Sequence, residues 1–142
     1  LRGVGTDFDA KSVSTGPVPV PKNVLAEIVR VRDERHERQP FSVTTTTRVR
    51  VYAVGEGSGG DMADYGWIED AATGRVIWEM TYRMTERAGG ANKNRMVETR
   101  LTLDSGDYIL HFRTDGSHSF SEWNSDPPED PERWGITLFL ED

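Results

Sequence analysis

Short segments in which every second residue is apolar dominate this chain, and they constrain its fold more than any other feature. Between residues 41 and 54, five apolar side chains share one parity, while Ser42, Arg48 and Arg50 take the other. These apolar positions are Phe41, Val43, Val49, Val51 and Ala53. Because successive side chains of a strand point to opposite faces of a sheet, this period of two predicts half-buried strands. Similar alternation marks residues 97–103, 108–112 and 136–140.

Turn-forming residues separate these segments. We expect Gly55–Gly60 to end the strand at 41–54, where four threonines favour the extended chain. Ala71–Gly74 is expected to form the loop of a hairpin, and Asp104–Gly106 to form another turn.

The number and spacing of the segments predict the fold class. With a further strand expected at 24–32, the chain has about seven short strands and no long helix. Residues 76–86 are ambiguous, since two methionines there also have the spacing of a short helix. We predict an all-β protein, an antiparallel β-sandwich of the jelly-roll or Greek-key kind, over residues 24–142. Three alternating prolines predict an extended arm or linker at 1–23.

Charge and the lack of cysteine exclude several function classes. The chain has 24 Asp and Glu residues against 17 Lys and Arg, so a nucleic-acid partner is not expected, because its phosphates would be repelled. No apolar run approaches the roughly 20 residues of a membrane-spanning helix. Without cysteine, disulfides and thiolate metal sites are impossible. The first residue is Leu1 and not Met, which suggests a processed protein or a domain of a longer chain.

Two acidic loops have the composition of a calcium site. Calcium takes six to eight oxygen ligands, many of them carboxylates and loop carbonyls. One candidate loop contains Glu56, Asp61 and Asp64, and the other contains Asp115, Asp126, Glu129 and Asp130. Neither has the register of an EF-hand, and solvated acidic loops are the alternative interpretation.

The glycines at 55–60 match the spacing of a dinucleotide-binding fingerprint. That fingerprint requires a helix to begin directly after the glycines, so that the helix N-terminus can hold the pyrophosphate. The following residues lack helical periodicity, and nearby acids would repel phosphates. We therefore expect a loop that connects two strands.

The segment 114–135 is the most unusual stretch of the chain, because long loops without regular structure in compact domains are often functional. An aromatic platform beside polar groups is typical of a sugar-binding surface. Residues that could form one are Trp123, Asn124 and Trp134 in this segment, with His118 and Trp67 as further ligand contacts. Alternatively, both indoles of the segment cap the open end of the sandwich.

His118 is also the one candidate for the base of a small hydrolase. It lies between Ser117 and Ser119, with Asp115 close by in sequence. A hydrolytic triad needs a nucleophile, a base and an acid that converge in space, and neighbours in sequence rarely do so. His36 and His111 are too scattered in sequence to suggest a zinc set. No catalytic residue is therefore assigned.

The order of features from residue 41 to residue 140 resembles bacterial pre-peptidase C-terminal domains. The matching features are a strand that ends in glycine at Val49–Gly55, a D-Y-G-W-I strand at Asp64–Ile68 with an Ala-Thr-Gly turn after it, and the step Leu103–Tyr108. The resemblance implies a β-sandwich module appended to a secreted enzyme, sometimes cation-binding and without catalytic residues.

These observations lead to an expected function. We expect a non-catalytic accessory or interaction module of a larger exported bacterial protein, located outside the cytoplasm or on the cell surface. Its partners would be neighbouring domains of the longer chain, or a cell-surface or glycan ligand. A carbohydrate-binding module and a small hydrolase are the alternatives.

Overall fold

The computed structural model describes residues 23–141 and contains nine β-strands in that range. The strands are β2 (Val24–Ile28), β3 (His36–Val43), β4 (Thr47–Ser58), β5 (Asp61–Asp70), β6 (Val76–Glu79), β7 (Glu86–Arg87), β8 (Asn94–Leu103), β9 (Gly106–Arg113) and β10 (Gly135–Leu140). Two short 3-10 helices, η2 (Tyr82–Met84) and η3 (Pro131–Arg133), complete the regular structure. The arm expected at 1–23 lies, apart from Asn23, outside the described residues.

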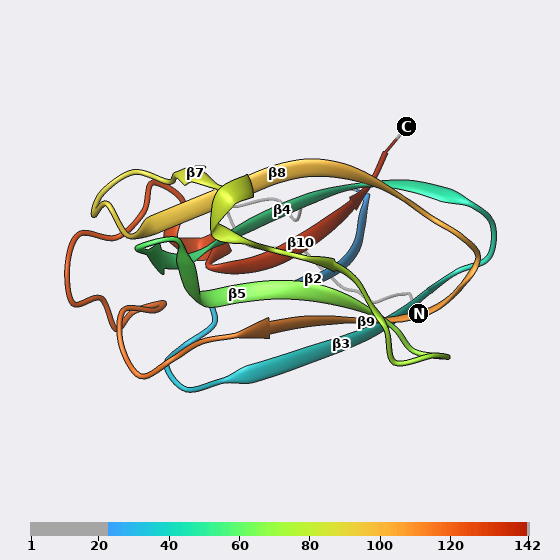
Figure 1. Cartoon of the computed structure of the whole chain (residues 1–142), viewed down its shortest axis with the longest axis horizontal. Helices are drawn as coiled ribbons and strands as arrows, with labels where there is room; N and C mark the ends of the chain where they lie inside the picture. The colour runs from blue at the N-terminus through green and yellow to red at the C-terminus, as the bar shows by residue number, and fades with distance from the viewer. Residues whose placement is uncertain (1–22, 142) are drawn as a thin grey trace, which may run out of the picture.

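The strands form two layers that β5 joins (Figure 1). One layer has the order β2-β10-β4-β8-β7, and the other has the order β3-β9-β5-β6. The first residues of β5 pair with β4, whereas Tyr65 and the residues after it pair with β9 in the other layer. All pairs between strands are antiparallel, which confirms the predicted all-β antiparallel fold.

The apolar side chains that alternate along the sequence line the space between the two layers. Side chains without exposed surface there are Val49, Val51 and Ala53 of β4, Ile68 of β5, Leu110 and Phe112 of β9, and Ile136 and Leu138 of β10. These residues belong to one continuous hydrophobic cluster. Burial of apolar surface stabilises the fold by about 25 cal/mol per Å² removed from water.

The prediction of a single strand at 41–54 is wrong, because the chain reverses its direction at Thr44–Thr46. Residues up to Val43 form β3 in one layer, and residues from Thr47 form β4 in the other. The Thr47 hydroxyl donates a hydrogen bond to the carbonyl oxygen of Thr45, 2.7 Å away. Threonine hydroxyls that bond to nearby backbone stabilise turns, and here this preference competes with the β propensity of the residue type.

The glycine-rich segment 55–60 does not end β4, and no helix follows it. The strand continues to Ser58, and a tight hairpin turn at Gly59 and Gly60 leads into β5. Both glycines have positive φ, 62° and 93°. Two-residue hairpin turns of this kind need φ above zero at both positions, where glycine carries no steric cost.

Backbone hydrogen bonds attach the segment between β9 and β10 to other parts of the fold at several points. The backbone amide of Phe120 donates to Val31, that of Glu129 donates to Ala88, and Asp126 accepts from Ala91. These bonds join the segment to the connections before β3 and before β8, so three connections gather at one end of the sandwich. We call this region the loop end. Among the described residues, no helix is long and apolar enough to cross a bilayer.

Candidate cation site at the loop end

Three carboxylates from three segments meet at the loop end. Glu56 of β4 lies directly opposite Asp64 of β5 in the strand register, and Asp115 comes from the segment after β9. Donor oxygens of the three residues all lie within 4.8 Å of one another. The two acidic loops expected separately from the sequence therefore contribute to one cluster, which we call the acidic triad.

Asp64 is the most buried member of the acidic triad. It has no exposed surface, and each of its oxygens accepts one hydrogen bond. The backbone amide of Asp115 donates to Oδ1 at 2.9 Å, and the indole Nε1 of Trp134 donates to Oδ2 at 3.1 Å. Burial raises the pKa of Asp64 to about 8, and the charges of Asp115 and Glu56 act in the same direction.

Glu56 contributes an oxygen that lacks a partner. Its Oε2 lies 3.4 Å from Nζ of Lys93, whereas its Oε1 is buried and has no hydrogen-bond donor. Burial and the charge of Asp115 raise the pKa of Glu56, while Lys93 opposes that rise. A buried carboxylate oxygen without a donor is costly, and a cation bound beside it would remove that cost.

The neighbouring glycine allows the two strands to approach closely enough for this pairing. A Cβ atom at Gly55 would lie 2.1 Å from the backbone oxygen of Asp64, far inside van der Waals contact. The register between β4 and β5 also shifts just after Glu56, so that Gly57 lies opposite Met62 and not opposite Ala63. A glycine at position 55 is therefore a condition for Glu56 and Asp64 lying side by side.

Aromatic rings of the segment between β9 and β10 pack beside the acidic triad, and one of them, Trp134, bonds to Asp64. The rings of His118, Trp123 and Trp134 pack edge to face, with centroids 4.9 to 5.5 Å apart. His118 Nε2 donates to Oδ1 of Asn94 at 2.6 Å, and the Asn94 amide in turn donates to the carbonyl of Asp126. Burial and the nearby charge of Lys93 lower the pKa of His118, so its imidazole is neutral at pH 7.

The residues predicted to contact a ligand are only partly accessible. Trp134 and His118 have no exposed surface, so neither offers a ring face to a ligand, and both belong to the packing under the loop end. Trp123 is half-buried, and Asn124 is exposed and accepts a hydrogen bond from Lys93 at 2.7 Å. Trp67 lies elsewhere, on the outer face of β5, where one of its faces stacks on His111.

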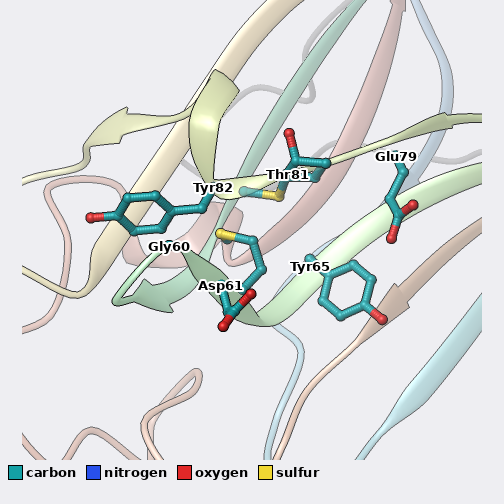
Figure 2. Close-up of a pocket in the computed structure, with 8 residues that line it drawn as sticks. Gly60, Asp61, Tyr65, Glu79, Thr81 and Tyr82 are labelled. Carbon is teal, nitrogen blue, oxygen red and sulfur yellow. The ribbon is translucent and has the colours of Figure 1, made fainter.

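The remaining predicted metal ligands do not join the acidic triad. Asp130 accepts a hydrogen bond from the hydroxyl of Tyr52, and Asp126 bonds through its backbone carbonyl. Asp61 lines a separate pocket of about 280 Å³ between β5 and η2, with Tyr65 and Tyr82 on either side of it (Figure 2). Of the seven acidic residues in the two candidate loops, the structure brings together Glu56, Asp64 and Asp115.

His118 does not have the surroundings that a hydrolase base requires. Its Nε2 bonds to an amide oxygen and not to a hydroxyl. The hydroxyl of Ser119 instead donates to Asp33 at 2.5 Å. The nucleophile, base and acid of the hydrolase hypothesis therefore do not converge at His118.

Two residues of the loop end were not found by sequence reasoning. Lys93 lies between Glu56 and Asn124, and Asn94 is a fully buried amide that joins three segments. The only signal for them is a pair of polar residues shortly before the alternating segment at 97–103.

Comparisons with known proteins give similarity in structure alone. The sequence matches no protein-family model, and it matches no curated protein. Among solved structures, the pre-peptidase C-terminal domain of a collagenase from Bacillus anthracis aligns with a TM-score of 0.42 and 8% identity, covering 82% of this chain and 86% of that chain. A protein from Sulfurospirillum deleyianum aligns with a TM-score of 0.45 and 11% identity, covering 82% of this chain and 96% of that one. A domain of the family that the sequence resembles is therefore among the solved structures that align with this chain.

Proposed function

We propose that this chain is a non-catalytic accessory module of a larger exported bacterial protein, and that its loop end binds calcium through the acidic triad. The accessory role and the location follow from the resemblance in sequence described above. The observation that carries the cation site is the buried Glu56 Oε1, which has no hydrogen-bond donor beside two further carboxylates.

The donor set fits a hard cation. Carboxylate oxygens are the ligands that calcium prefers, and waters and loop carbonyls would fill the remaining positions. Imidazole or thiolate ligands, which zinc favours, are not in the triad. A divalent charge would balance the negative charges of the three carboxylates. Because burial raises the pKa of Asp64 to about 8, calcium binding would release a proton from Asp64.

A calcium ion would also join separate parts of the fold. Glu56 and Asp64 lie on neighbouring strands, whereas Asp115 belongs to the segment that follows β9. An ion held by all three would fix the loop end relative to the strands. In this proposal the cation is structural, and it prepares the module to contact its neighbours or a surface ligand.

Thermal unfolding with and without calcium tests the cation site. Because a ligand that binds only the folded state stabilises it by mass action, millimolar calcium should raise the melting temperature of the chelator-treated protein. A calcium concentration about 100 times the Kd would add about 2.7 kcal/mol to the free energy of unfolding. Glu56→Gln and Asp64→Asn should each abolish the shift.

A matched control lies on the same strand as Asp64. Asp61→Asn removes an exposed carboxylate three residues away, outside the acidic triad, and should leave the calcium shift unchanged. An unchanged melting temperature of the wild-type protein at millimolar calcium would refute the site. Equal loss of the calcium-induced shift in melting temperature in all three variants would mean that calcium stabilises the protein through its overall negative charge and not through the acidic triad.

A further inference from the structure

A second group of ligating side chains lies on the outer face of the β3-β9-β5 layer. His36 of β3 and His111 of β9 are 75 residues apart in sequence, yet Nε2 of His36 lies 2.9 Å from Nδ1 of His111. The two histidines are scattered in sequence, but the pairing of β3 with β9 brings their side chains together.

The carboxylate of Glu69 determines which nitrogen of His111 carries the proton. His111 Nε2 lies 2.8 Å from Oε1 of Glu69, and an ionised carboxylate can only accept. The proton of the neutral imidazole is thus on Nε2, and Nδ1 directs its lone pair toward His36. Carboxylates that accept from the second nitrogen of a histidine are a common support of metal-bound imidazole.

Trp67 holds the His111 ring in this orientation. The two rings are nearly parallel, 7° apart in plane, with centroids 4.6 Å apart. His111 is 5% exposed, whereas His36 is exposed at the start of its strand. One imidazole is therefore buried and held between two partners, and the other is open to solvent.

The spacing of the two nitrogens matches a square arrangement of ligands. Two metal–nitrogen bonds of about 2.0–2.1 Å that meet at a right angle place their nitrogens about 2.9 Å apart. Right angles are typical of copper(II) and nickel(II), and copper(II) binds such ligands most tightly among the divalent ions of the first transition row. Tetrahedral zinc would require the two nitrogens to lie farther apart than 2.9 Å, because its ligand–metal–ligand angles are wider than a right angle.

We propose that His36 and His111 form a two-histidine site for a divalent transition metal, with copper(II) as its tightest occupant. The ion takes the place of the hydrogen bond between the two nitrogens. The proton on Nε2 of His36 is lost to solvent and Nδ1 of the same ring takes one up, so that Nε2 of His36 and Nδ1 of His111 both offer a lone pair to the ion. Two positions of the square remain open to water or to a ligand from a partner. This site is independent of the calcium proposal.

The charges around the pair make metal binding dependent on pH. Desolvation by burial, together with the charges of Arg38 and Arg113, lowers the pKa of His36. Arg38 and Arg113 also oppose a bound cation, whereas Glu69 favours it. Binding should therefore weaken as the medium becomes acidic.

Copper titration of the tag-free protein tests this site, because copper(II) quenches the fluorescence of a nearby indole. One equivalent of copper should quench part of the tryptophan emission, and Trp67→Phe should remove most of that quenching. His36→Ala should weaken binding at least about tenfold, and Glu69→Gln should weaken it by roughly 10-fold to 100-fold, the range for supports of a metal ligand. Since His36 is exposed, its variant should keep the wild-type melting temperature.

Electron paramagnetic resonance counts the imidazoles on the first copper equivalent. The wild-type spectrum should show two coordinated nitrogens, and the His36→Ala spectrum should show fewer. Glu98→Gln, on β8 in the other layer, serves as the control that should bind as the wild type does. Equal affinity of wild type and His36→Ala, or no saturable binding by the wild type, would leave the pair as a hydrogen bond alone and overturn the proposal.

Discussion

Asp64 places an ionisable carboxyl group in the interior of the fold, where its charged form is unfavourable. Its carboxyl group is fully buried, two donors are directed at it, and Glu56 and Asp115 are close neighbours. Burial raises its pKa to about 8 from an ordinary value of 3.8. Between those two values, the folded protein holds a proton that the unfolded chain has released.

This difference predicts how stability depends on pH. In the absence of calcium, the free energy of unfolding should fall as pH rises from about 4 to about 8, by at most about 1.4 kcal/mol per pH unit from this group. Asp64→Asn cannot ionise, so its pH dependence should be flatter. Urea unfolding in chelator at about pH 5 and about pH 8 measures the effect. The same slope in both proteins would show that Asp64 is not the titrating group.

At the scale of secondary structure, the β4–β5 hairpin positions the acidic triad. Its turn at Gly59 and Gly60 fixes the register, and the shift after Glu56 lets β5 leave the β4 layer and continue beside β9. Two of the three carboxylates are therefore placed by one hairpin. The third is placed by the backbone bond from Glu34 to Asp115, which holds the segment after β9 in position.

Gly55→Ala should disrupt this hairpin. The added Cβ would lie 2.1 Å from the backbone oxygen of Asp64, so β4 and β5 would have to separate. We expect a loss of roughly 1–3 kcal/mol in the free energy of unfolding, as for other overpacked sites, together with loss of the calcium shift. Gly116→Ala is the control, since its nearest contact would be an ordinary 3.4 Å. Similar stability of both variants in chemical denaturation would contradict this account.

At the scale of the whole molecule, one core joins the two layers. Leu138 of β10 and Phe112 of β9 come from opposite layers and belong to the same buried cluster. Because β5 pairs within both layers, neither layer is separate from the other. The described part of the chain should therefore unfold as a single unit.

Truncation of a core side chain tests whether the two layers unfold together. Leu138→Ala should cost about 2–5 kcal/mol, and tryptophan fluorescence and far-ultraviolet circular dichroism should report the same transition. Leu140→Ala on the same strand is the control, because Leu140 is 41% exposed and its truncation should cost no more than about 0.5 kcal/mol. Two separate transitions would show that the layers unfold independently.

The fold class, the alternation of buried side chains and several turns could be predicted from the amino-acid sequence. Tyr108, Leu110 and Phe112 are buried as their alternation predicts, and the hairpin loop at Ala71–Gly74 lies where expected. These properties could be predicted because alternation and turn preference are local, and burial acts on each strand in the same way. The exception at Thr44–Thr46 is a turn stabilised by a local hydroxyl, which the β propensity of threonine concealed.

Which side chains come into contact could not be predicted in this way, because it depends on how the strands pair. Glu56 and Asp64 are joined by a strand register, Asp115 by backbone bonds across loops, and His36 and His111 by a pairing over 75 residues. Such contacts depend on the order of strands and on the shift between them, and a one-residue change in register would move each side chain to the opposite face. Composition showed that acids and histidines were available, whereas the packing of the two layers determined which of them lie close together.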